Sequence, residues 1–177
     1  MKITYFIRRA VICLLLIAAL YILQTAVFSH LELAGVVPNL LLALVALTGF
    51  MRGRKEGMVV GMAAGLLLDT FSGQLFGIYA LLFLLLGYLN GVVRQVFFGD
   101  DIKLPVLFVG LTDIVYGICV YLISFASRGR TDFRFFFFNV MLPEAVYTIV
   151  ISFVLYPLLQ WIAGRTDRYE SKGDRRF

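Results

Sequence analysis

Long apolar runs separated by short charged clusters constrain this chain more than any other feature. A helix needs roughly 17–25 apolar residues to cross the hydrocarbon core of a bilayer, and most of these runs are that long. Apolar residues make up 61% of the chain and charged residues 15%, whereas soluble domains have about 45–50% and 25%. Because this excess extends along the whole chain, the sequence predicts an all-α integral membrane protein.

The apolar runs predict six transmembrane helices in a single domain over residues 1–163. The predicted spans are about 10–29, 38–51, 57–71, 75–93, 104–126 and 135–163. The second and third spans are short, and in an alternative arrangement the third and fourth form one re-entrant hairpin. Residues 164–177 are expected to form a polar cytoplasmic tail that is frayed or disordered.

The distribution of positive charge predicts the orientation of these spans. The net charge is +5, and thirteen of the sixteen Lys and Arg residues fall on the side of the N-terminus when six spans are assumed. By the positive-inside rule, both termini are then cytoplasmic. The exceptions are Arg128, Arg130 and Arg134, which share one external loop whose role stays open. The cations are not gathered on one basic face, so nucleic acid is not an expected partner.

Three glycines line one face of the third predicted span. Gly57, Gly61 and Gly65 follow each other at intervals of four residues, and such a face allows close helix contact in lipid. It is a candidate surface for a partner helix. The alternative, which we favour, is packing within the chain. Gly87 and Gly91 repeat the pattern once in the fourth span.

Asp69 lies at the predicted external end of the third span, directly after three leucines. Its carboxylate can accept hydrogen bonds from backbone N–H groups at a helix end. We favour this structural interpretation. The functional alternative is a polar contact in a pocket that faces outward.

Two further acids, Asp113 and Glu144, lie near mid-depth in the fifth and sixth spans. Each is about nine residues into its span, which corresponds to roughly 13 Å of helix. A charge at mid-depth costs at least about 2.5–3.5 kcal/mol, so such side chains face the protein interior. Asp113 shares a helix face with Tyr116, and Glu144 shares one with Tyr147. A polar pocket or proton-linked site and a structural hydrogen-bond network are equally compatible with this pattern. Pro143 should kink the sixth span beside Glu144.

No pattern of catalytic or metal-binding residues is present in the sequence. Cys13, Cys119 and His30 are scattered, and no spacing typical of a metal site or a nucleophile with its base occurs. The loops are too short to hold a soluble catalytic domain. We therefore expect a protein that is not an enzyme and that needs no metal or cofactor.

Several weak motifs, in a fixed order, resemble one known family. VPNLLLALVALTGFMRGRKEG, then GMAAGLLLDTFSGQLFGIYALLFLLLGYLNGVVR, and later MLPEAVYTIVISFVLYPLL are similar to segments of the MreD family of rod shape-determining membrane proteins. The likeness covers roughly residues 8–163. The positions that match the family pattern are Pro38, Asn39, Gly61, Gly65, Asp69, Gly73, Gly77, Tyr79, Pro143, Glu144 and Tyr147.

This resemblance implies a function and a set of partners. Such proteins belong to the bacterial elongation machinery in the cytoplasmic membrane and bind MreC, a bitopic protein with a periplasmic coiled coil and β domain. Through MreC they are linked to MreB, RodA and a class B penicillin-binding protein, and they regulate lateral peptidoglycan synthesis. A homodimer within the complex is also possible. Their fold is similar to the six-helix S components of energy-coupling-factor transporters, so a small-molecule-binding transporter subunit is the alternative function.

Overall fold

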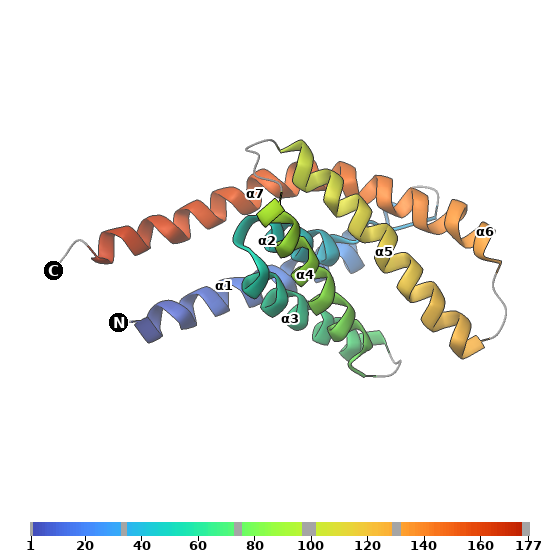
Figure 1. Ribbon diagram of the computed structural model, residues 1–177, viewed down its shortest axis with the longest axis horizontal. Helices are drawn as coiled ribbons and strands as arrows, with labels where there is room; N and C mark the ends of the chain where they lie inside the picture. Colours follow the sequence, from blue (N-terminus) through green and yellow to red (C-terminus); the bar gives the residue numbers. More distant parts are fainter. Residues whose placement is uncertain (1, 33–34, 73–75, 97–101, 129–131, 175–177) are drawn as a thin grey trace.

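The computed structural model describes residues 2–32, 35–72, 76–96, 102–128 and 132–174, and this part of the chain is helical without strands. The elements are α1 (Lys2–Ile22), η1 (Leu23–Val27), α2 (Leu40–Arg52), α3 (Arg54–Ser72), α4 (Ile78–Val96), α5 (Lys103–Arg128), α6 (Phe133–Phe136), η2 (Phe137–Met141) and α7 (Leu142–Asp174). The π-helical segment η1 continues α1, and α6 leads through η2 into α7 (Figure 1). The all-α prediction is confirmed.

Four of these helices are long and apolar enough to cross a membrane. They cover Ile7–Val27, Ile78–Gln95, Lys103–Ile123 and Phe133–Arg165. The prediction of six spans is therefore wrong by this measure, and α2 and α3 account for the difference. The thirteen residues of α2 extend for only about 20 Å, and α3 carries charged residues in its first turn and at Asp69.

The short helix α2 forms the centre of the molecule. Ten of its thirteen residues are buried, and α1, α3, α4, α5 and α7 all contact it. A helix that is apolar on every side is stable when other helices surround it. Because α2 is covered by its neighbours, it does not need to match the full thickness of the bilayer.

Glycines with positive φ lie between α2 and α3 and directly before α4. Gly53, with φ of 94°, is the single residue between α2 and α3, and its N–H group donates to the Gly49 carbonyl at 2.8 Å. Gly77, with φ of 101°, directly precedes α4. Residues other than glycine rarely adopt such angles. The helices α2, α3 and α4, which flank these glycines, pack against one another.

The last helix departs from the sequence-based expectation at both ends. Pro143 is its second residue and follows the π-helical segment η2, in which the Leu142 N–H group donates to the Phe137 carbonyl. The sequence predicts a kink at Pro143, and the structure instead has a widened π-helical turn directly before the start of α7. At the other end α7 continues to Asp174, so the prediction of a frayed or disordered tail over 164–177 is wrong for residues 164–174.

Both chain termini lie at one end of the molecule (Figure 1), which we call the terminal end. Arg9 of α1, Arg52 at the end of α2 and Glu56 at the start of α3 meet there. At the opposite end, Arg134 is exposed in α6. Arg130 and the Arg128 side chain lie outside the described residues, as does Gly73 of the family motif.

Candidate functional site

The glycine face of α3, formed by Gly57, Gly61 and Gly65, lies against the backbone of α4. A Cβ atom added to any of the three would collide with a backbone carbonyl oxygen of α4, from Gly87, Phe83 and Tyr79 respectively. The hypothesis that this face receives a partner helix therefore does not fit the structure, because the position is already occupied. Packing within the chain, the alternative, describes what is observed.

Asp69 joins the end of α3 to the start of α4. Its two carboxylate oxygens accept hydrogen bonds from the N–H groups of Tyr79, at 3.0 Å, and Ala80, at 2.9 Å. Only 3% of the residue is exposed. The first N–H groups of a helix have no partner within the helix, and a carboxylate there also interacts favourably with the helix dipole. The geometry is that of a helix-end residue that caps the following helix.

Side chains from three segments satisfy the buried start of α2. The N–H group of Leu41 donates to Gln24 Oε1, at 3.2 Å, and that of Leu42 donates to Asn39 Oδ1, at 3.1 Å. The N–H group of Asn39 itself donates to Thr148 Oγ1 of α7, at 3.1 Å. Buried backbone donors need such partners. Asn39, which matches the family pattern, is thus the cap that connects α2 to α7.

Asp113 of α5 is buried beside this cap, near the Thr148 hydroxyl but without a well-formed hydrogen bond. Its exposed fraction is 4%, and neither carboxylate oxygen has a hydrogen-bond partner in the described part of the chain. Thr148 and Glu144 are its neighbours from α7. Buried carboxylates are normally bonded or paired, so Asp113 is the polar group whose position packing alone does not explain.

The other candidate residues from the sequence are divided between two places. Tyr116 lies with Asp113 and Glu144, and its ring packs against Phe83 at a centroid distance of 5.6 Å. Tyr147 points elsewhere, because its hydroxyl donates to the Leu31 carbonyl at 3.1 Å. The structure therefore groups Asp113, Tyr116 and Glu144 and leaves Tyr147 outside this group.

A buried acid beside a half-buried one, as Asp113 is beside Glu144, can share a proton with it or bind a cation. The described residues contain no group of three or more His, Cys, Asp or Glu side chains that could hold a metal ion. The Asp113 group is therefore a candidate site for a proton, a monovalent cation or the positive group of a ligand.

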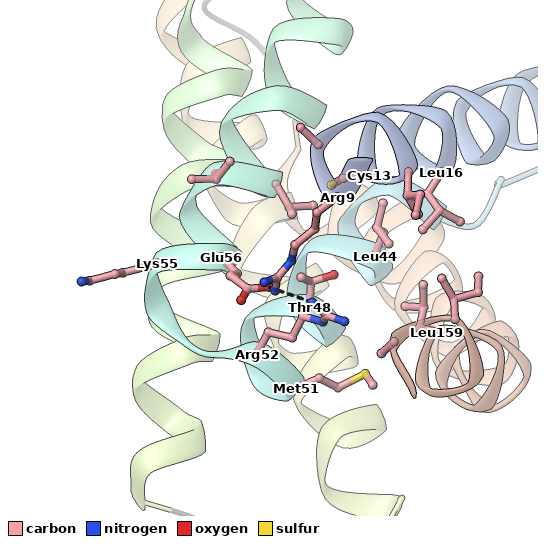
Figure 2. Close-up of a pocket in the computed structure, with 16 residues that line it drawn as sticks. Arg9, Cys13, Leu16, Leu44, Thr48, Met51, Arg52, Lys55, Glu56 and Leu159 are labelled. Carbon is pink, nitrogen blue, oxygen red and sulfur yellow. Dashed lines mark hydrogen bonds and ion pairs between the residues drawn. The ribbon is translucent and has the colours of Figure 1, made fainter. Parts of the chain in front are cut away.

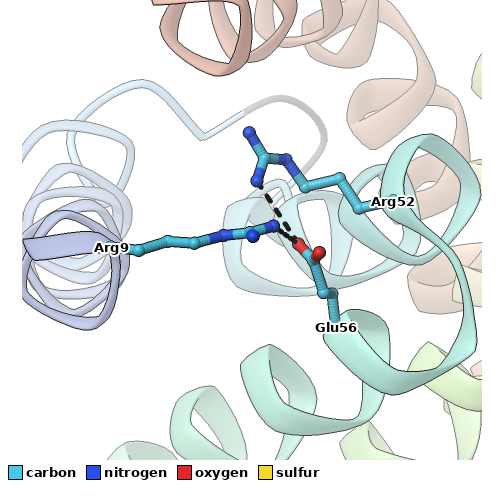
Figure 3. Close-up of polar contacts among 3 residues, drawn as sticks. All are labelled: Arg9, Arg52 and Glu56. Atoms are coloured by element: carbon cyan, nitrogen blue, oxygen red, sulfur yellow. Dashed lines mark hydrogen bonds and ion pairs between the residues drawn. The ribbon is translucent and has the colours of Figure 1, made fainter. Parts of the chain in front are cut away.

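Sequence reasoning missed a cavity of about 440 Å³ at the terminal end, between α1, α2, α3 and α7 (Figure 2). Its charged border is formed by Glu56, which pairs with Arg9 and, at 3.4 Å, with Arg52 (Figure 3). Arg9 is far from the other two residues in the sequence, whereas Arg52 and Glu56 are four residues apart. That relation is the one local signal that could have indicated the cluster.

The fold and these sites define a class: a polytopic membrane protein with a short buried helix and a polar interior. The model of the family described as rod shape-determining protein MreD matches residues 4–163. The chain belongs to the MreD family, and the predicted membership is confirmed. No curated protein and no solved structure matches the chain, so the likeness to S components of energy-coupling-factor transporters stays a prediction.

Proposed function

We propose that the chain is a non-catalytic scaffold and regulator of the bacterial elongation machinery, and that it binds an MreC-like bitopic protein. The family match over residues 4–163 carries this proposal. Membership of the family makes the chain a rod shape-determining membrane protein. The contact with an MreC-like protein and the control of lateral peptidoglycan synthesis are the further steps that we propose.

The proposed complex lies in the cytoplasmic membrane with both termini in the cytoplasm. The MreC-like protein links the chain to MreB, RodA and a class B penicillin-binding protein, and a second copy of the chain can be present. Both termini lie at the same end of the molecule, which supports an even number of membrane crossings (Figure 1). The excess of cations on that side supports a cytoplasmic position for the termini.

The contact for the partner's single helix must lie on an exposed apolar face. The glycine face of α3 is covered by α4, and α2 is buried. Helix α5, in contrast, exposes Leu107 and Leu111. Lipid also covers such faces, so a contact map is needed to choose among α1, α4, α5 and α7.

The experiment is purification of the tagged chain in a mild detergent with mass spectrometry of the proteins that accompany it. We expect a stoichiometric single-span coiled-coil protein, with wall-synthesis enzymes at lower yield. A photoreactive residue at Leu111, which is 54% exposed, tests the α5 face, and Leu47, which is fully buried, is the matched control. Recovery of an ATPase pair with a coupling membrane subunit would contradict the proposal.

The alternative of a small-molecule-binding subunit is favoured by one observation, the absence of a hydrogen-bond partner for both Asp113 oxygens within the described residues. A ligand with a positive or hydrogen-donating group would satisfy them. Under this alternative, native mass spectrometry of the purified chain should show a retained small molecule, and Asp113→Asn should lose it. A chain that is free of ligand and whose melting temperature does not respond to a library of vitamins would exclude this function.

A further inference from the structure

The cavity at the terminal end has a charged part and an apolar part on opposite sides. Figure 2 shows Arg9, Arg52 and Glu56 on one side and Leu16, Leu44 and Leu159 on the other. Thr48 is the uncharged polar side chain in the lining. A ligand that fits both parts must itself have a polar and an apolar end.

The charged part favours an anion. Glu56 is the shared partner of two guanidinium groups (Figure 3), so the three side chains together carry a formal charge of +1. Lys55 adds a further cation to the border, although its side chain extends away from the cavity (Figure 2). A guanidinium presents five N–H donors and binds phosphate groups well through paired hydrogen bonds. Glu56 acts here as a positioning residue that holds both arginines at the cavity.

The size of the cavity indicates what kind of apolar group enters it. Its volume of about 440 Å³ is within the range of roughly 300–1,000 Å³ for small-ligand sites. A transmembrane helix, about 10 Å wide and 30 Å long, occupies on the order of 2,400 Å³. A partner helix therefore cannot enter this cavity, whereas a hydrocarbon chain can.

The residues beside the cavity include types that are common at the level of lipid head groups. Trp161, next to the lining residue Ile162 on α7, is 57% exposed, and the Arg165 guanidinium lies 4.0 Å from the centroid of its ring. Tryptophan is enriched at the membrane–water interface. Basic pockets between helices on the cytoplasmic side are suited to acidic lipid head groups.

Weak packing of α1 leaves this space open. Among the α1 residues whose side chains are described, only Ile17 and Leu20 are buried. Near its start, α1 is joined to α3 by the ion pair of Arg9 and Glu56. We propose that the cavity is a binding site for an anionic phospholipid, with its phosphate against Arg9 and Arg52 and one acyl chain in the apolar part.

The two natural cysteines allow a direct test, because Cys13 lines the cavity and Cys119 of α5 does not. The full chain in an uncharged detergent is treated with N-ethylmaleimide and either dioctanoyl phosphatidylglycerol, dioctanoyl phosphatidylcholine or inorganic phosphate. At ten times its dissociation constant a ligand leaves about one tenth of the sites empty. Phosphatidylglycerol should therefore slow the labelling of Cys13 about tenfold and leave Cys119 unchanged.

Variants separate the two parts of the site. The double variant Arg9→Gln and Arg52→Gln should raise the phosphatidylglycerol concentration for half-protection about tenfold or more, because charge-assisted hydrogen bonds are lost. Arg165 is an exposed basic residue at the same end, and Arg165→Gln should leave the phosphatidylglycerol concentration for half-protection unchanged. Ala163→Phe should fill the apolar part and abolish protection while both arginines remain. An unchanged Cys119 rate reports that each variant is folded.

Three results would overturn the proposal. Equal protection by phosphatidylcholine would show that the charged border does not select the ligand. Equal protection by inorganic phosphate would show a site for a free anion. Protection of Cys13 by the co-expressed MreC-like protein, without any by lipid, would assign the cavity to a protein partner.

Discussion

At the scale of the residue, the buried polar side chains divide into those with defined partners and one without. Asp69 bonds two N–H groups of α4, and Thr148 accepts from Asn39. Asp113 is equally buried and has no hydrogen bond within the described residues. A buried group that is bonded stabilises the fold, whereas an unbonded one destabilises it. Substitution should therefore separate the structural residues from the candidate functional one.

Asp69→Ala removes the acceptor for two N–H groups at the start of α4. We expect the free energy of unfolding to fall by about 1–2 kcal/mol, as for the loss of other helix caps. The measurement is thermal unfolding of the purified chain in detergent. Asp132→Ala is the control, because Asp132 precedes α6 without a side-chain cap, and equal effects of the two changes would contradict the capping role.

Thr148→Val should lower the stability of the fold, whereas Asp113→Val should not. The first replaces a fully buried hydroxyl with a methyl group and leaves the Asn39 N–H group unsatisfied, which costs about 1–3 kcal/mol. The second removes a buried carboxylate without a bond, so the melting temperature should stay the same or rise. A marked loss of stability in Asp113→Val would show that the carboxylate contributes a stabilising hydrogen bond, for which Thr148 is the neighbouring side chain.

At the scale of the element, α3 and α4 form the most closely packed pair of helices. Glycines on both sides allow it: a Cβ on Gly87 would meet the backbone of Gly57, and one on Gly91 would meet that of Arg54. In lipid such close contact is a main source of helix association. A hydrogen bond between Asn90 and Thr112, at 2.9 Å, then joins α4 to α5.

Gly61→Ala should separate α3 from α4, because its methyl group would overlap the Phe83 carbonyl. Forced insertion of a methyl group into a packed contact costs about 1–3 kcal/mol or more. We expect a lower melting temperature and aggregation on size-exclusion chromatography. Gly164→Ala is the matched control, since nothing lies within 4 Å of its added Cβ. If both variants behaved alike, the close helix contact would be refuted.

At the scale of the whole molecule, the alternating helices bring both termini to one end (Figure 1). The cations of that end include Arg9, Arg52 and Lys55, whereas Arg134 lies at the other end. Orientation follows the larger number of cations, which remain in the cytoplasm. This gives each end of the molecule a predicted side of the membrane.

Single cysteines test that orientation in a background without Cys13 and Cys119. Asp132→Cys should react with a membrane-impermeant thiol reagent in intact cells, because it is exposed at the end opposite the termini. Lys55→Cys, exposed at the terminal end, should react only after the membrane is opened. The reverse labelling pattern would require the opposite orientation.

The sequence predicted the bounds of the helices more accurately than the contacts between them. The bounds of α2, α3, α4 and α5 lie within three residues of the predicted spans, because apolar runs and glycine breaks are local signals. The extension of α7 to Asp174 was missed, since polar residues outside a membrane can also be helical. Hydropathy marks the apolar part of such a helix and not its end.

The sequence predicted site residues only where a residue type is rare in its surroundings, such as an acid within an apolar segment. Asp69, Asp113 and Glu144 were identified because acids are rare in apolar segments. The partners of these residues, and the meeting of Arg9 with Glu56, depend on contacts between distant segments. No local pattern encodes such contacts, so the cavity at the terminal end could not be predicted.

The central position of α2 has a consequence for synthesis of the protein. The ribosome delivers α2 before α4, α5 and α7, yet these later helices supply much of its cover. Until they arrive, an apolar segment about 20 Å long has only α1, η1 and α3 beside it. Final docking of α2 must therefore wait for the C-terminal half of the chain. A nascent protein released before α7 would be a substrate for membrane quality control.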